Sequence, residues 1–253
     1  MGGWKGLREK FYKKMSLLIF FLCFTTTLAA PTPKDCPSLL EKADSCITRA
    51  ALFGDANIPR SNEEMDVHCS LGQEYSSCVK AYGKCLKPFP RQILYLMISN
   101  MKKLMKDTCD SETKRQEFLL HSKCMTPEKI PRVKRLLDKV TIHLNHIAYN
   151  VSKEAKIPFI CCSFFVGREE MEREVTEMCE STETKEWLIK MMERAVNDAV
   201  DLACGKYSSI QVCRKEIPEG METLERIIQD QYFVPQNSSF FVPLMAITED
   251  LDD

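Results

Sequence analysis

Glycine is scarce in this sequence of 253 residues, which contains only 9 of them. No segment alternates apolar and polar residues in the way that a half-buried strand requires. Methionine, leucine, glutamate and lysine are abundant instead, and these residues favour helices. The sequence therefore predicts an all-α protein, a disulfide-stapled bundle of about eight or nine helices.

The short motifs that mark common active sites are also missing. The sequence contains no Gly-x-Ser-x-Gly, no glycine-rich phosphate loop and no His-Glu-x-x-His. The pair Cys161-Cys162 is similar to the cysteine pair of secreted phospholipases, but no His-Asp pair follows it to activate a water molecule. His143 and His146 are close enough to share a metal on a helix surface, yet no third ligand has a matching spacing. We therefore expect no catalytic residue, no cofactor and no metal site.

Long apolar runs are missing after residue 30, and the run before it has the layout of a secretory signal peptide. Basic residues precede the apolar segment from Met15 to Phe24, and small residues follow it. This segment is short for a membrane span. We therefore expect residues 1–29 to be a cleaved signal peptide, with an uncleaved signal anchor as the alternative. The mature chain is expected to be secreted and extracellular, without a membrane span.

An excess of positive charge is absent once this leader is removed. From residue 30 onward, 30 basic residues stand against 35 acidic ones. Nucleic acids and anionic membranes require a basic face. We therefore expect no nucleic acid and no membrane as the main partner.

Cysteine, in contrast, is plentiful. The mature chain holds 12 cysteines, an even number that is typical of a disulfide framework in a secreted protein. Cys161 and Cys162 are expected to bond to different partners, because a bridge between neighbours is strained; the pairing is otherwise open. Sequons at Asn150 and Asn237 predict N-glycosylation. The expected disulfide cysteines are Cys36, Cys46, Cys69, Cys78, Cys85, Cys109, Cys124, Cys161, Cys162, Cys179, Cys204 and Cys213.

Apolar residues spaced three and four apart predict the helices. A capping box begins the helix from Ser61 to about Lys87. Its cysteines project to opposite sides, so we expect bridges on two of its faces. Pro158 is expected to interrupt a helix that begins near Thr126. The other expected helices cover about 37–54, 93–109, 110–124, 161–180, 181–205, a short piece reaching 213, and 218–230.

Four cysteines occur twice in the same order, which predicts two pseudo-repeats at about 36–126 and 127–216 within one disulfide-rich helical domain, 30–231. An irregular tail, 232–253, is expected to follow, with its aromatic part lying on the body. The matched series are Cys69, Cys85, Cys109 and Cys124 in the first copy and Cys162, Cys179, Cys204 and Cys213 in the second.

The cysteine spacings resemble those of the arthropod 27-kilodalton haemolymph glycoprotein family. The resemblance covers roughly Cys36 to Cys213, and the chain departs from it at Met171, where a cysteine is expected, and in its additional Cys161. It implies a secreted, helical, disulfide-bonded protein of a body fluid or secretory gland, with no catalytic residues to carry over. The residues that carry it are Cys69-x8-Cys78-x6-Cys85-Leu86, the 24-residue step to Cys109, Phe118-Leu119 before Cys124, and Cys162 to Cys204 with the Cys46 helix as the opening of the second half.

Together these features predict a non-enzymatic secreted glycoprotein that binds or carries an apolar small molecule or an extracellular protein. The alternatives are a secreted structural or immune-effector component, or a hydrolase whose site gathers histidines or carboxylates from distant helices. Methionines and aromatics at helical spacing fit a core, and they also fit an apolar ligand pocket. These residues are Met97, Met101, Met105, Met191, Met192, Phe164 and Phe165.

Overall fold

The structure, a computed structural model, describes residues 35–49, 58–229 and 239–251, and every regular element in these ranges is helical. The described ranges contain ten α-helices, one more than the predicted maximum, because α11 was not predicted. A 3₁₀ turn, η1, follows α3. The elements are α2 (Cys36–Thr48), α3 (Asn62–Tyr82), η1 (Gly83–Cys85), α4 (Pro88–Asp110), α5 (Glu112–Ser122), α6 (Ile130–Asn150), α7 (Lys153–Met178), α8 (Thr182–Cys204), α9 (Ile210–Glu216), α10 (Pro218–Ile227) and α11 (Phe241–Leu251).

Local sequence signals place most helix ends. The hydroxyl of Ser61 accepts a hydrogen bond from the Glu64 amide at the start of α3, and Ser181 caps α8 in the same way. Gly205, with φ +32°, ends α8. The predicted break at Pro158 was wrong, since α7 runs through it. Pro158 has no backbone N–H to donate, so α7 lacks one backbone hydrogen bond there, but the helix continues to Met178.

All twelve predicted cysteines are paired. Three bridges attach α3 and η1 to the neighbouring helices, as expected for a helix held on two faces, and Cys161 and Cys162 have different partners. The six bridges are Cys36–Cys85, Cys46–Cys78, Cys69–Cys109, Cys124–Cys179, Cys161–Cys204 and Cys162–Cys213.

The bridges do not follow the register of the predicted pseudo-repeats. Cys69 pairs with Cys109, whereas its counterpart Cys162 pairs with Cys213. Cys204, the counterpart of Cys109, pairs with the additional Cys161. The duplication itself stays a prediction.

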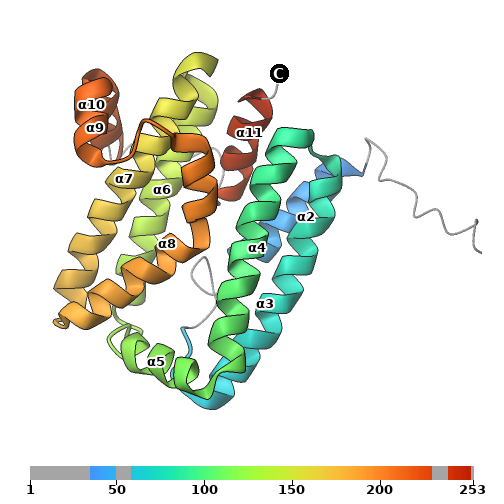
Figure 1. The fold of residues 1–253 in the computed structure, drawn as a ribbon, viewed down its shortest axis with the longest axis vertical. Coiled ribbons are helices and arrows are strands. Elements are labelled where there is room, and N and C mark those ends of the chain that lie inside the picture. The colour runs from blue at the N-terminus through green and yellow to red at the C-terminus, as the bar shows by residue number, and fades with distance from the viewer. Residues whose placement is uncertain (1–34, 50–57, 230–238, 252–253) are drawn as a thin grey trace, which may run out of the picture. The chain divides into compact units, whose positions relative to one another are not determined.

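Three clusters of buried apolar residues form the core. One lies among α6, α7, α9 and α10 and includes Ile147 and Leu224. The second joins α2, α3 and α4 around Tyr82 and Leu94. A third, with Met178, lies where α7 meets α5 and α6. Figure 1 shows α3 beside α4 and α6 beside α7, and α8 packs against both α4 and α7.

Helix α11 corrects the prediction of an irregular tail at 232–253 over residues 241–251, whereas 232–238 and 252–253 lie outside the described residues. Phe241 and Met245 belong to the core cluster of α2, α3 and α4, and Ile247 belongs to that of α6 and α7. Each of these side chains is at most 1 % exposed. Pro243 is compatible with a helix here because it lies in the first turn, where the backbone N–H has no intrahelical partner. The expected docking of the aromatic part is confirmed for Phe241.

Polar contacts also hold α11 in place. The Tyr82 hydroxyl donates to Glu249 at 3.1 Å, and the buried Lys156 ammonium pairs with Asp250 at 2.7 Å and donates to the Ala148 carbonyl. The Ser239 hydroxyl, just before the helix, donates to Asp44. No disulfide attaches α11 to the other helices, since α11 contains no cysteine. Packing and these side-chain contacts therefore hold α11.

Two predictions concern residues that the structure does not describe, the signal peptide at 1–29 and the sequon at Asn237. The other sequon is described. Asn150 is the last residue of α6, and Ser152 precedes α7. Both side chains are exposed.

Candidate functional site

His143 does not lie on a helix surface, as its pairing with His146 had suggested. It is 2 % exposed and bridges three helices. Its Nε2 lies 2.9 Å from the Leu224 carbonyl of α10, which can only accept, so this nitrogen carries the proton. The Ser163 hydroxyl of α7 then donates to Nδ1 at 3.0 Å.

The hydrogen bond between Ser163 and His143 is the one that activates a serine nucleophile in hydrolases, but both side chains are buried. Ser163 is 5 % exposed, so a substrate has no route to the hydroxyl in this conformation. Burial lowers the pKa of His143 to about 4, which makes the imidazole a weak base at neutral pH. The pair is a satisfied polar link inside the core of α6, α7 and α10.

His143 predicts a loss of stability in mild acid. The unfolded chain binds a proton near pKa 6.5 and the folded protein near 4. The contribution of the neutral His143 to the free energy of unfolding is therefore fully present above pH 6.5. It is lost as the pH falls to 4, by about 3 kcal/mol in total. The measurement is the free energy of unfolding against pH for the wild type, His143→Gln and the control His121→Gln. The His143→Gln profile should be flatter, whereas a profile parallel to the wild type would contradict the prediction.

The other described histidines lie in aromatic contacts. His121 stacks on Trp187 with ring centroids 5.1 Å apart, and His68 lies 5.8 Å from Phe118. These contacts connect α5 to α8 and to α3. His146 lies beside a phenylalanine of α7, and burial, followed by a nearby arginine, lowers its pKa. No group of three metal-binding side chains gathers within the described ranges.

Of the methionines and aromatics considered for a pocket, Phe164 and Phe165 line a hollow. This hollow, of about 280 Å³, lies between α7 and α8 and is also lined by Arg168, Glu193 and Asp201. The five methionines are partly buried on α4 and α8, which pack against one another. They therefore contribute to helix packing.

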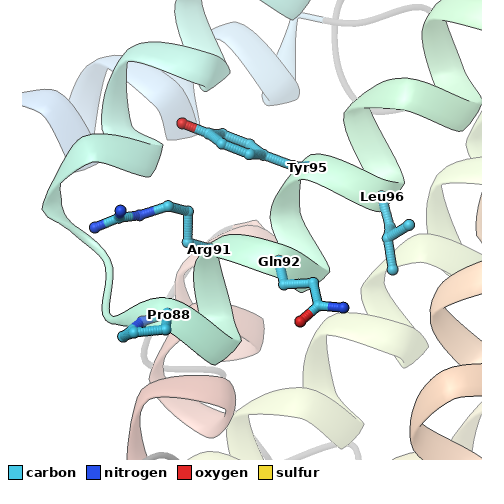
Figure 2. A pocket seen from close by; sticks show the side chains of 5 residues that line it. All are labelled: Pro88, Arg91, Gln92, Tyr95 and Leu96. Atoms are coloured by element: carbon cyan, nitrogen blue, oxygen red, sulfur yellow. The ribbon is translucent and has the colours of Figure 1, made fainter.

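A second hollow, of about 480 Å³, lies along the first turns of α4 (Figure 2). Pro88, Gln92 and Leu96 line it together with Arg91 and Tyr95. Arg91 is held in place because its guanidinium donates to the backbone carbonyls of η1 and the residue after it, at 3.0 and 2.5 Å. Among the described residues, no carboxylate forms an ion pair with Arg91.

The position of the Tyr95 ring depends on Gly83. A Cβ added at Gly83 would come within 2.5 Å of the Tyr95 ring, so the ring takes the place of a side chain there. Tyr95 remains 36 % exposed. Sequence reasoning missed Arg91 and Tyr95, although a signal was visible: no acidic residue occurs from Tyr75 to Lys106.

Both hollows are open to solvent. Pockets for small apolar ligands usually bury most of the ligand surface. The described residues thus define a disulfide-bonded all-α protein with open hollows on its surface. None of the helices in the described ranges has the length and apolar character needed to cross a bilayer.

No protein-family model, no curated protein and no solved structure matches this chain. The resemblance to the haemolymph glycoproteins therefore stays a prediction.

Proposed function

We propose that this chain is a secreted, non-enzymatic glycoprotein of a body fluid or secretory gland, and that it binds a protein partner through its outer surface. The signal-like leader, the complete pairing of the twelve cysteines and the exposed sequon at Asn150 support secretion. The absence of a long apolar helix in the described part is compatible with it.

We favour binding through the outer surface because both hollows are open to solvent. A carrier of an apolar small molecule requires an enclosed cavity. A hydrolase requires a nucleophile that its substrate reaches, whereas Ser163 is buried beside His143. A surface that contacts another protein requires neither feature.

The test is expression of the full chain in a eukaryotic secretory cell line, followed by native mass spectrometry of the protein from the medium. We expect a mass that begins at residue 30, includes six disulfides, carries an N-glycan that Asn150→Gln reduces, and lacks bound lipid. Asn62→Gln, at an exposed position without a sequon, controls for the substitution. Retention in the cell would contradict secretion, and a stoichiometric lipid adduct would favour the carrier.

A further inference from the structure

One continuous stretch of the chain has an unusual charge. Residues 75–106 contain seven basic residues and no acidic one. From residue 30 onward, the remainder holds 23 basic residues against 35 acidic ones. The stretch covers the end of α3, the turn η1 and most of α4. We call its exposed side the α4 basic face, made of Lys80, Lys84, Lys87, Arg91, Lys102, Lys103 and Lys106.

The charges of this face are largely uncompensated. All seven residues are exposed, and five lysines form no ion pair with a described residue: Lys80, Lys84, Lys102, Lys103 and Lys106. Other helices of the protein interleave and pair opposite charges. Arg132 and Lys139 of α6, for example, bind Glu174 and Glu170 of α7. The α4 basic face therefore differs from the ordinary solvated helix surfaces of this protein.

The acidic residue that directly follows the stretch is paired with another helix. Asp107 forms an ion pair with Arg194 of α8 at 2.5 Å. Asp110, the next acidic residue, lies at the last position of α4. The seven basic residues therefore outnumber the acidic groups of their own segment, which gives the face a net positive charge.

The centre of the face is uncharged. Between Arg91 and Lys102 lie eleven helical steps, or about 17 Å along the axis. The exposed ring of Tyr95 and the side chain of Leu96 occupy this interval and line the hollow of Figure 2. An aromatic and apolar centre between charged ends has the arrangement of a protein–protein interface. A polysaccharide or a lipid surface would be matched by continuous positive charge.

We propose that the α4 basic face docks an acidic protein that presents an apolar side chain between two groups of carboxylates. The apolar side chain lies in the hollow against Tyr95 and Leu96, and the carboxylates face the two lysine groups. This inference rests on the proposed function and names the class of the partner. Opposite charges raise the association rate, and the apolar centre slows dissociation.

The test uses the full secreted protein and two fluorescent peptides. Each has two runs of four glutamates, joined in one by a Leu-Phe pair and in the other by a Gly-Ser pair. The centres of the runs lie about 20 Å apart in an extended chain, close to the spacing of the basic groups. Binding is measured by fluorescence anisotropy at low and physiological salt, with a heparin oligosaccharide and phosphatidylserine vesicles as competing probes.

We expect the Leu-Phe peptide to bind about tenfold more tightly than the Gly-Ser peptide, because it buries apolar surface. Lys103→Glu with Lys106→Glu should weaken its binding about tenfold at low salt. The matched control, Lys134→Glu with Lys215→Glu, changes the net charge equally on exposed positions of α6 and α9 and should have little effect. Tyr95→Ser should remove the difference between the peptides. Thermal unfolding verifies that each variant is folded.

Three results would overturn the proposal: no binding of the Leu-Phe peptide at low salt, equal binding of both peptides, or stronger binding to heparin or vesicles that Tyr95→Ser leaves unchanged. None of these results bears on secretion, glycosylation or the absence of lipid, which the mass spectrum tests separately. Failure of the docking surface is therefore distinguishable from failure of the proposed function.

Discussion

Replacing Phe241 by alanine is expected to lower the free energy of unfolding by about 3–5 kcal/mol, the usual cost of removing a buried aromatic side chain. Phe241 is 1 % exposed and lies edge-on to Tyr82, with ring centroids 6.0 Å apart. No disulfide crosses the contact, so the cavity left by the ring is not offset by a covalent restraint. In a protein of this size the loss corresponds to a fall of roughly 6–20 °C in Tm.

Val242→Ala is the matched control. Val242 is the next residue of α11 and is only partly buried. Its shortening should cost at most about 1 kcal/mol, because it removes two methyl groups that are not fully enclosed. Differential scanning fluorimetry and denaturant unfolding measure both variants. Equal shifts for the two would mean that α11 is not seated against α3 as the structure shows.

Removal of the Cys161–Cys204 bridge is expected to have an effect of similar size. The bridge closes a loop with a sequence separation of 43 residues, and the chain-entropy model gives about 4 kcal/mol for its loss. Cys161 is fully buried and Cys204 is 7 % exposed, so substitution by alanine also leaves a cavity. We therefore expect the Cys161→Ala, Cys204→Ala variant to lose more stability than loop closure alone predicts.

The Cys46–Cys78 bridge provides the comparison. Its sequence separation of 32 residues gives an entropic contribution only about 0.3 kcal/mol smaller. Both cysteines are partly exposed, so their removal opens less of the core. The difference in unfolding free energy between the two double variants measures the packing part of the effect. Equal losses would mean that chain entropy alone accounts for the buried bridge.

For His143, helical periodicity predicts burial but does not identify the hydrogen-bond partners. The residue lies three positions after Val140 and four before Ile147, both on the predicted inward face of α6, so the same spacing also predicts burial of His143. Its reading as half of a surface pair came from its proximity to His146. Its partners, Ser163 and Leu224, are 20 and 81 residues away in sequence, and no local pattern identifies them.

The acid-free stretch was visible in the sequence, but its meaning was not. A stretch of seven basic residues and no acidic one indicates a positively charged surface only if the side chains are exposed and are not paired with acidic neighbours. The tertiary structure is needed to show both. The hollow beside Tyr95 depends on Gly83 of η1, whose missing side chain leaves room for the tyrosine ring. It also depends on Arg91, whose guanidinium donates to a backbone carbonyl. Such a site arises from packing between α3 and α4.

The order of the amino acids is sufficient for the helical class, the Ser61 and Ser181 caps and the disulfide use of the cysteines from residue 30 onward. These properties follow from backbone preference and composition, which act over a few residues. The pairing of the cysteines, the burial of His143 and the seat of α11 required the tertiary structure. They depend on contacts between distant segments, such as Phe241 on Tyr82, and the energy of such a contact comes from surface that only the folded chain removes from water.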